Sequence, residues 1–190
     1  MKKQIRILGI DDGPFTFEDT YSILVGAIMR GGEYLECILR NYITIDGTDA
    51  TDICIDMILH TRYKKQLKAI MIDGVTLGGF NVIDIDHIFQ ITRIPVITIT
   101  RDKPDLIKIK KALQKHFQDW QQRLTFLKKG KIHTVPTSHN PLYIKCTGLT
   151  LKEAEDIIKL STIRGVIPEP LRIALLIASG ISRGESYGKA

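Results

Sequence analysis

The change of hydrophobic period near residue 48 limits the folds open to this chain more than any other feature. Before it, residues 5–11, 21–30 and 34–45 show the alternating or continuously apolar patterns of strands. Gly31-Gly32 predicts a hairpin turn between the second and the third of these strands. After it, helical spacing alternates with short apolar runs. An antiparallel meander followed by strand–helix units predicts a mixed α/β sheet.

The second part of the chain continues this alternation. Short buried strands are predicted at 68–73 and 95–100, with a candidate late strand at 141–146. Helices are predicted at 49–60, 82–91, 105–127, 149–160 and 168–178. This order of elements is that of the ribonuclease H-like fold, with a five-stranded mixed sheet, three antiparallel strands before the parallel ones, and helices on both faces. The length of 190 residues predicts one domain, residues 1–190.

Two aspartates end strands that this topology makes neighbours. Asp11 ends the first strand and Asp73 ends the strand at 68–73. Both strands would lie parallel at the centre of the sheet, where the strand order reverses and where open α/β sheets bind their ligands. Carboxylates that converge without histidine or thiolate suit Mg²⁺ or Mn²⁺. Such an ion polarises a phosphodiester and activates water.

A third acid is expected from the helix at 49–60. Asp49, Asp52 and Asp56 lie on one face of it. Asp49 stands where aspartate caps a helix, so we interpret it first as a cap. Asp52 lies one turn deeper and is the better ligand candidate. Asp12 alternates away from Asp11 and is interpreted as a turn residue.

Positive charge is concentrated in residues 101–131, which we name the basic segment. It holds ten basic and three acidic residues, a net charge of +7, while the whole chain carries +6. Such a patch suits a polyanion, here nucleic acid. Lys108, Lys111 and Lys115 line one face of the helix predicted at 105–127. A basic face that only contacts solvent is an equally open interpretation.

Other features exclude some protein classes. No apolar run reaches the length of a membrane span, and the short apolar start predicts a strand rather than a signal peptide. Cys37, Cys54 and Cys146 form no CxxC pair, which indicates core residues of a protein in a reducing, cytoplasmic compartment. Asp-x-Gly on a first strand also occurs in actin-like ATPases, but these need two copies of the fold. The chain has no repeat and no Walker-type loop.

Four motifs resemble a known group of nucleases. They are "GIDDG", "AIMIDG", "IPVITITR" and "RGVIPEPLRIALLIA". Together they resemble endonuclease V and, more closely, the archaeal endonuclease dU family. The closer likeness extends to "GFNVID", "DATDI" and "GESYGK" and covers nearly the whole chain.

The resemblance implies a role for several residues. Asp11 and Asp73 match the metal ligands of the first and fourth strands, and Asp52 is the nearest equivalent of a glutamate, about one residue out of register. Arg101 stands where endonuclease V has a lysine, and its guanidinium would hold a phosphate. Arg172 closes "IPEPLR", which resembles a late segment that starts a helix, and we expect it to contact nucleic acid together with the three lysines.

The chain also departs from endonuclease V. Gly148-Leu149 stands where that family has Gly-His, and "ITIDG" at 43–47 replaces the wedge that probes the lesion. The resemblance implies a metal-dependent endonuclease of DNA repair that acts at deaminated bases, uracil first and hypoxanthine second. The alternative is a nucleic-acid-binding or regulatory protein that kept the fold without the chemistry. The sequence favours DNA but leaves RNA, and the oligomeric state, open.

Overall fold

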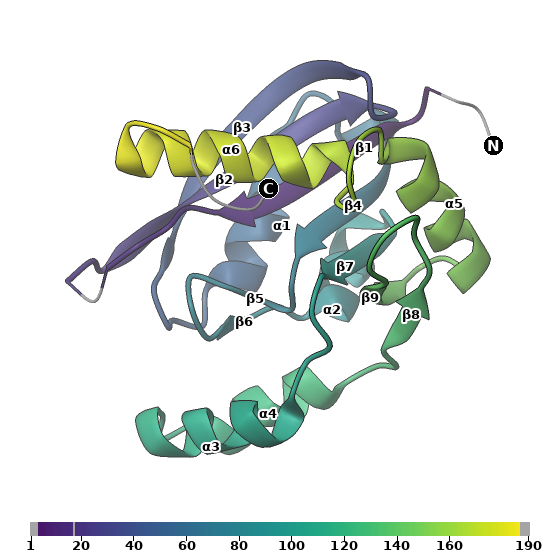
Figure 1. The fold of residues 1–190 in the computed structure, drawn as a ribbon. Coiled ribbons are helices and arrows are strands. Elements are labelled where there is room, and N and C mark those ends of the chain that lie inside the picture. The colour runs from purple at the N-terminus through teal and green to yellow at the C-terminus, as the bar shows by residue number, and fades with distance from the viewer. Residues whose placement is uncertain (1–3, 17, 187–190) are drawn as a thin grey trace.

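A seven-stranded mixed sheet runs through the protein in the order β3-β2-β1-β4-β7-β9-β8 (Figure 1). The computed structural model describes residues 4–16 and 18–186. The strands of the sheet are β1 (Arg6–Asp12), β2 (Tyr21–Arg30), β3 (Tyr34–Thr44), β4 (Leu67–Asp73), β7 (Val96–Thr100), β8 (His133–Val135) and β9 (Leu142–Thr147). A separate two-stranded ribbon consists of β5 (Thr76–Leu77) and β6 (Asn81–Val82).

The pairing confirms the predicted topology and extends it. β1, β2 and β3 are antiparallel, and β4 and β7 then run parallel to β1. The predicted number of five strands is wrong, because β9 pairs antiparallel with β7 and β8 pairs with β9. These two strands cover the hydrogen-bonding edge that β7 would otherwise leave open. β8 has only three residues, too few for a clear alternating pattern in the sequence.

Helices cover both faces of the sheet, as predicted. They are α1 (Ala50–His60), α2 (Ile85–Thr92), α3 (Leu106–His116), α4 (Trp120–Lys128), α5 (Leu151–Ser161) and α6 (Glu169–Arg183), with a 3-10 turn at Lys64–Gln66. One apolar cluster joins α1 and α2 to Leu8, Ile10, Ile70 and Ile72 of β1 and β4. A second joins α5 and α6 to Ile7, Ala69, Met71 and Ile97 on the other face.

The single long helix predicted at 105–127 is wrong. Phe117 has an extended backbone (φ −130°, ψ 130°) and ends α3, and α4 begins after Asp119. The break lets the Phe117 ring pack edge-on against Phe80, with 5.6 Å between the ring centroids, and the Arg123 guanidinium lies 4.4 Å from the centre of the Phe117 ring. Contacts with other parts of the chain therefore override a regular helical spacing.

Close packing fixes α6 along β1. A Cβ atom on Gly9 would overlap the backbone carbonyl of Pro170, so only glycine lets the helix start lie this near the strand. At the other end, a Cβ atom on Gly13 would lie 2.5 Å from Ser182 Oγ. α6 thus runs alongside β1 and ends near the carboxyl end of that strand.

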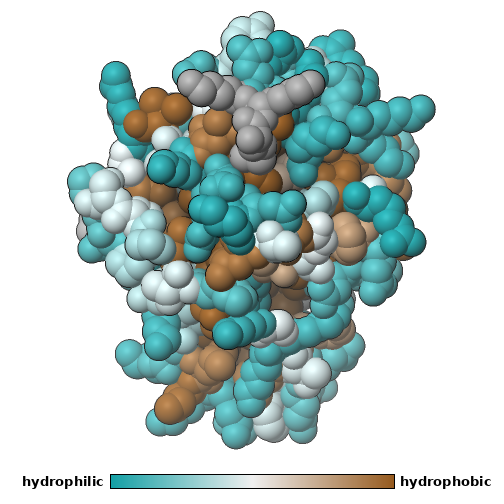
Figure 2. Space-filling view, turned by 90° about the vertical axis from the view of Figure 1, so that its right-hand side faces the viewer, coloured by the Kyte–Doolittle hydropathy of each residue, from teal (hydrophilic) through white to brown (hydrophobic). Residues whose placement is uncertain are grey.

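Within the described ranges, no helix is long and apolar enough to span a bilayer. On the face shown in Figure 2, hydrophobic residues are interspersed with hydrophilic ones. Cys54 is buried, but Cys37 and Cys146 are only half-buried, so the interpretation of all three as core residues holds for Cys54 alone.

Candidate active site

Asp11 and Asp73 meet at the carboxyl ends of β1 and β4. The two strands are parallel, and Ile10 pairs with Ile72 one residue earlier. Because side chains alternate along a strand, Asp11 shares the face of Ile7, and Asp73 shares the face of Met71. Ile7 and Met71 belong to the cluster under α5 and α6. The two carboxylates therefore project from adjacent strands toward the same face.

The two carboxylates also affect each other electrostatically. Burial raises the pKa of Asp11 well above its usual value, and the charges of Asp73 and then Asp12 raise it further. Burial also raises the pKa of Asp73, while Arg101 lowers it. Asp11 is 5% exposed, and its Oδ1 accepts a hydrogen bond from the Asp12 N–H at 2.9 Å. Like charges held together in a buried place are costly to the fold, and such arrangements are typical of functional sites.

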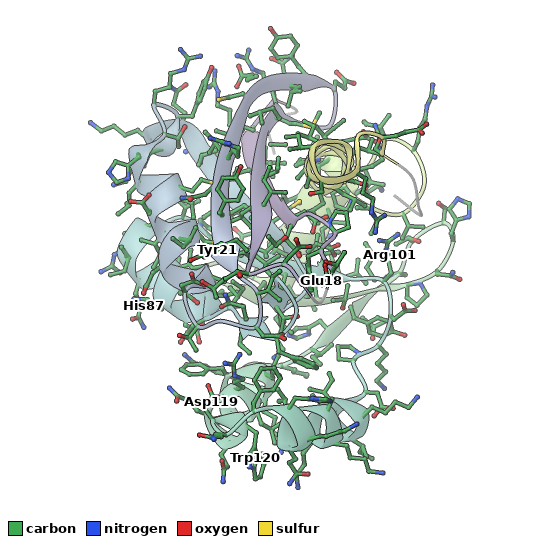
Figure 3. All side chains as sticks on the ribbon, turned by 90° about the vertical axis from the view of Figure 1, so that its left-hand side faces the viewer. Glu18, Tyr21, His87, Arg101, Asp119 and Trp120 are labelled. Atoms are coloured by element: carbon green, nitrogen blue, oxygen red, sulfur yellow. The ribbon has the colours of Figure 1, made fainter. Side chains whose placement is uncertain are left out.

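Arg101 supplies positive charge beside this pair. It directly follows β7, whose residue Ile99 pairs with Asp73 of β4, and its charge acts on both aspartates. Figure 3 views the sheet from its edge, with Arg101 on the side where α6 lies and His87 on the side of α1. The three predicted site residues Asp11, Asp73 and Arg101 are thus brought together from three neighbouring parallel strands.

The donor set fits a hard divalent cation. Within the described part of the chain, Asp11 Oδ2 is buried and has no hydrogen-bond partner, so a buried acceptor is left without a donor. Carboxylate oxygens are the ligands that Mg²⁺ and Mn²⁺ favour, and Mg²⁺ commonly takes one or two of them with water and phosphate. The described residues hold no group of three or more His, Cys, Asp or Glu side chains arranged around a metal position. Asp11 and Asp73 are therefore the two side chains of the described residues that we consider as candidate ligands.

Asp12 has a different role from its neighbour. Its Oδ2 accepts a hydrogen bond from the Gly78 N–H at 3.0 Å, in the turn between β5 and β6. Gly78 and Gly79 both have a positive φ, which suits glycine in such a turn. Burial raises the pKa of Asp12 to about 6. Asp12 is therefore not the predicted turn residue: it is the last residue of β1, and it ties the carboxyl end of that strand to the ribbon.

Comparison with known proteins adds a family to this geometry. Residues 3–182 match the family model described as endonuclease dU. The chain belongs to the endonuclease dU family. Its sequence is 49% identical to the UPF0215 protein of Methanosarcina mazei, across 100% of this chain and 97% of that protein. It is 46% identical to the UPF0215 protein of Methanothermobacter thermautotrophicus, across 100% and 94% of the two chains.

Solved structures extend the likeness of this endonuclease dU chain to the fold. A protein of unknown function from Archaeoglobus fulgidus superposes with a TM-score of 0.84 at 40% identity, across 94% of this chain and 98% of that one. Endonuclease V of Ciona intestinalis, in complex with a 24mer DNA that contains an inosine followed by a ribo-adenosine, superposes with 0.62 at 12% identity, across 92% and 84%. Marinitoga piezophila Argonaute superposes with a TM-score of 0.55 at 16% identity, across 93% of this chain and 30% of that one. These likenesses show the ribonuclease H-like fold. Together with the family, they support a nuclease.

Asp52 is not brought to the acidic pair. It is exposed in the first turn of α1, on the sheet face opposite to Asp11, and it lines a hollow of about 310 Å³ together with His87 and Arg123. The geometry therefore does not support its expected role as a third ligand. Spacing on a helix face predicted that the acids of α1 share a side, but it does not tell which sheet face that helix covers.

Asp49 does not act as the predicted cap. It occupies the position before α1, but its carboxylate makes no capping hydrogen bond to that helix. It accepts hydrogen bonds from Thr44 Oγ1 at 2.8 Å and Asn81 Nδ2 at 2.6 Å, so it holds the end of β3 to the β5–β6 ribbon. Hydrogen bonds to its charged form keep the pKa of Asp49 low despite burial.

The predicted nucleic-acid contacts lie in two places. Lys108, Lys111 and Lys115 are exposed on α3, and Lys108 Nζ lies 3.6 Å from Asp105 Oδ2. Arg172 lies near the start of α6 and donates to Glu169 Oε2, with Nη2 at 2.6 Å. The start of α6 lies against Gly9 of β1, and the contact of Arg172 with nucleic acid stays a prediction.

Sequence reasoning missed Arg123. It is 8% exposed and donates to the backbone carbonyls of Gly47 and Phe80. The signal in the sequence was its i,i+4 spacing from Asp119, which it also contacts. That spacing does not tell a buried pair from one of the many pairs on the surface.

Proposed function

We propose that this protein is a divalent-metal-dependent endonuclease that cleaves DNA at deaminated bases, with uracil as the first candidate and hypoxanthine as the second. The observation that carries the proposal is the buried Asp11–Asp73 pair, with the unpartnered Asp11 Oδ2, at the carboxyl ends of parallel strands. Membership in the endonuclease dU family supports the uracil substrate. The inosine-containing DNA bound by Ciona intestinalis endonuclease V supports DNA and a deaminated base.

In this proposal each residue of the site has a separate role. Asp11 and Asp73 would hold Mg²⁺ or Mn²⁺, which when bound polarises the phosphodiester and activates water. Arg101 would bind a phosphate oxygen beside them and offset its negative charge. The lysines of the basic segment would hold the strand through its phosphates, independent of sequence. Flipping a damaged base out of a duplex costs less free energy than flipping a normally paired base, which adds selectivity.

The test is cleavage of labelled DNA strands that carry one uracil, one hypoxanthine or no lesion. Each strand is incubated with the protein and Mn²⁺, Mg²⁺ or a chelator. Metal-dependent cleavage of the uracil strand, with the undamaged strand intact, is the expected result. Equal cleavage of all strands would contradict the lesion specificity, and cleavage in the chelator would contradict the metal dependence.

A second candidate is a nucleic-acid-binding protein without catalysis. The position of Asp52 favours it, as does Leu149, which packs with the apolar cluster under α5 where endonuclease V has a histidine. Calorimetry with Mn²⁺ separates the two. The nuclease should bind the ion through Asp11 and Asp73, and the non-catalytic protein should bind DNA with no measurable uptake of the ion.

A further inference from the structure

The two helices of the basic segment form a unit that stands apart from the sheet. α3 and α4 build an apolar cluster of their own around Leu113, Leu124 and Leu127. This cluster reaches the rest of the protein at Val75, Phe80 and Val82, around the β5–β6 ribbon, and it is separate from the clusters on the two sheet faces. Figure 1 shows α3 and α4 below the sheet. The place of α3 and α4 relative to Asp11 therefore depends on their contacts with this ribbon and with the segments next to it.

Arg123 makes the best defined of these contacts. Its Nη1 donates to the Gly47 carbonyl at 2.9 Å and to the Phe80 carbonyl at 2.7 Å. Its Nε donates to both carboxylate oxygens of Asp119, at 2.9 and 3.0 Å. One buried guanidinium thus joins α4 to the loop after β3, at Gly47, and to the turn between β5 and β6, at Phe80. The planar fork of donors allows this, and a lysine has no equivalent.

Hydrogen bonds connect the loop at Gly47 and the turn at Phe80 to the acidic site. Asp46, next to Gly47, accepts from the Phe80 N–H at 2.8 Å and donates its own N–H to the Gly78 carbonyl at 2.7 Å. Gly78 donates to Asp12 Oδ2 at 3.0 Å, and the Asp12 N–H donates to Asp11 Oδ1 at 2.9 Å. Asp46 has a positive φ of 56°, in the left-handed region that aspartate adopts more readily than most other non-glycine residues. An unbroken chain of contacts therefore runs from Arg123 on α4 to Asp11 on β1.

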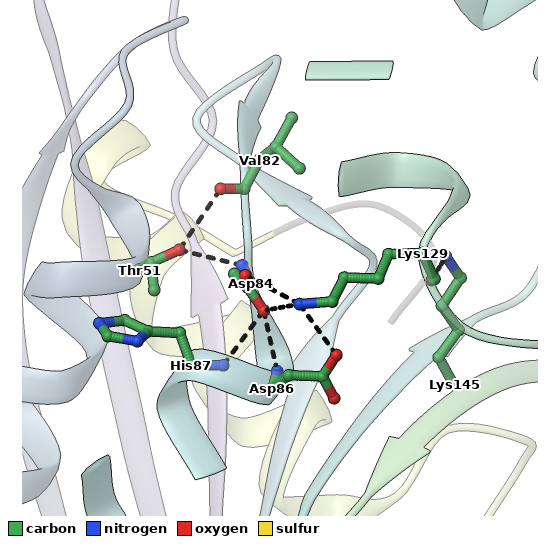
Figure 4. A network of polar contacts seen from close by, with 7 residues as sticks. All are labelled: Thr51, Val82, Asp84, Asp86, His87, Lys129 and Lys145. Carbon is green, nitrogen blue, oxygen red and sulfur yellow. Dashed lines mark hydrogen bonds and ion pairs between the residues drawn. The ribbon is translucent and has the colours of Figure 1, made fainter. Parts of the chain in front are cut away.

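A second attachment of the basic segment ends elsewhere. Lys129 Nζ lies 3.2 Å from Asp84 Oδ2 and 3.0 Å from Asp86 Oδ2, and Lys145 Nζ donates to the carbonyls of Leu127 and Lys129 (Figure 4). These contacts tie the end of α4 to the start of α2 and to β9. They connect α4 to the sheet at β9, which pairs with β7, whereas the contacts of Arg123 connect α4 to the loops beside Asp12 at the carboxyl end of β1.

We propose that Arg123 is a positioning residue. It fixes the basic segment so that a strand bound to the lysines of α3 passes over Asp11 and Asp73 in the geometry that cleavage requires. This inference rests on the proposed function. A misplacement of about 1 Å by a change far from the reacting atoms can lower a rate about 100-fold, so loss of the contact should affect turnover more than binding.

The first test needs no substrate. Amide hydrogen exchange by NMR is compared for wild type, Arg123→Gln and the control Arg164→Gln, an exposed arginine between α5 and α6. The amides of Asp46, Gly78 and Phe80 should exchange at least about tenfold faster in Arg123→Gln and at the wild-type rate in the control. The Met71 amide in the sheet should stay protected in all three, which shows that the variant is folded. Unchanged exchange at Gly78 and Phe80 would overturn the proposal.

The second test separates binding from turnover. In Arg123→Gln and in Arg123→Lys, kcat for a uracil-containing strand should fall about 10- to 100-fold, while the dissociation constant measured without metal changes less than about threefold. Arg123→Lys keeps the charge, so a fall in kcat there excludes a purely electrostatic role. Wild-type kcat in Arg123→Lys, or a fall only in affinity, would overturn the proposal. If the wild-type protein cleaves no strand, the proposed function fails, and the exchange data alone then decide whether Arg123 holds the basic segment to these loops.

Discussion

At the scale of single residues, Asp11 shows what distinguishes a functional acid from a structural one. A structural carboxylate is stabilised where it lies, as Asp49 is by Thr44 and Asn81, and the pKa of Asp49 is lowered. Asp11 is buried beside a second carboxylate, one of its oxygens has no partner among the described residues, and its pKa is raised. Asp11 therefore destabilises the metal-free fold, and a bound cation would offset this cost.

The first prediction concerns the acidic pair. Asp11→Asn and Asp73→Asn should each abolish metal-dependent cleavage and leave the melting temperature of the metal-free protein equal or higher. Asparagine keeps the size of the side chain but removes one of two repelling buried charges. Relief of about 1 kcal/mol would raise the melting temperature by about 2–4 °C in a protein of this size. Thermal unfolding by circular dichroism and the uracil-strand assay measure the two effects.

The matched control is Asp56→Asn. Asp56 is exposed on α1, and its ion-pair partner there is His60, also exposed, so both activity and melting temperature should stay close to wild type. Asp52→Asn should resemble this control, because Asp52 lies apart from the pair. A melting temperature that falls by several degrees in Asp11→Asn would mean that Asp11 is a structural acid.

At the scale of elements, the sequence predicted whatever depends on local pattern. Hydrophobic period identified β1, β2, β3, β4 and β7, and the parallel pairing of β1 with β4 followed from their order. Asp11, Asp73 and Arg101 could be found because each stands at or just after a strand end, where the order of the strands determines which side chains lie near one another. Pattern could not show the break at Phe117, the placement of Asp52 away from the acidic pair or the contacts of Arg123, because each depends on which distant segment packs against the helix.

The second prediction concerns α3. Replacement of Lys108, Lys111 and Lys115 by glutamine should weaken DNA binding and flatten its salt dependence, by up to about 0.9 units of log–log slope per lost phosphate contact on duplex DNA. Turnover at saturating substrate should stay near wild type, opposite to the Arg123 variants. Fluorescence anisotropy between low and moderate salt gives the slope. An unchanged slope would leave the face of α3 as one that only contacts solvent.

The third prediction concerns the packing of α6 on β1. Gly9→Ala should destabilise the protein by more than about 3 kcal/mol, because its Cβ atom would overlap the Pro170 carbonyl and neither backbone can move alone. Gly180→Ala is the matched control: it lies within α6, its Cβ atom would lie 4.0 Å from the nearest atom, Ser186 N, without overlap, and alanine should stabilise the helix by about 1 kcal/mol. Urea unfolding of both variants measures the difference. Equal stability of the two variants would contradict the close approach of α6 to β1.

At the scale of the whole molecule, the acidic site should set how stability depends on pH. Three neighbouring carboxylates, those of Asp11, Asp12 and Asp73, have raised pKa values in the folded protein. Other carboxylates have lowered values, among them Asp49 and Asp86. A raised pKa stabilises the fold only while the group is protonated, and a lowered pKa stabilises it only while the group is ionised. The two sets therefore act in different pH windows.

The fourth prediction follows from that sign. Asp12 titrates near 3.8 when unfolded and at about 6 when folded, so between these values the folded protein binds more protons than the unfolded chain. The free energy of unfolding should then decrease as pH rises from about 4 to above 6, by at most about 3 kcal/mol from Asp12. Asp11 and Asp73 act in the same direction. Below pH 4 the carboxylates with lowered pKa values, such as Asp49 and Asp86, become protonated and lose their stabilising interactions, so stability should fall again as the pH drops.

Urea unfolding of the metal-free protein between pH 3.5 and 7.5 measures this curve, and Asp12→Asn should flatten its descending part. Mn²⁺ should reverse the slope, because the ion binds the ionised pair and is therefore bound more tightly at pH 7 than at pH 5. Asp11→Asn should lose that reversal while it keeps the descent due to Asp12. A metal-free protein whose stability stays level or rises from pH 4.5 to 6.5 would mean that the acids at the carboxyl ends of β1 and β4 are not held as a repelling group, and the metal site would lose its physical basis.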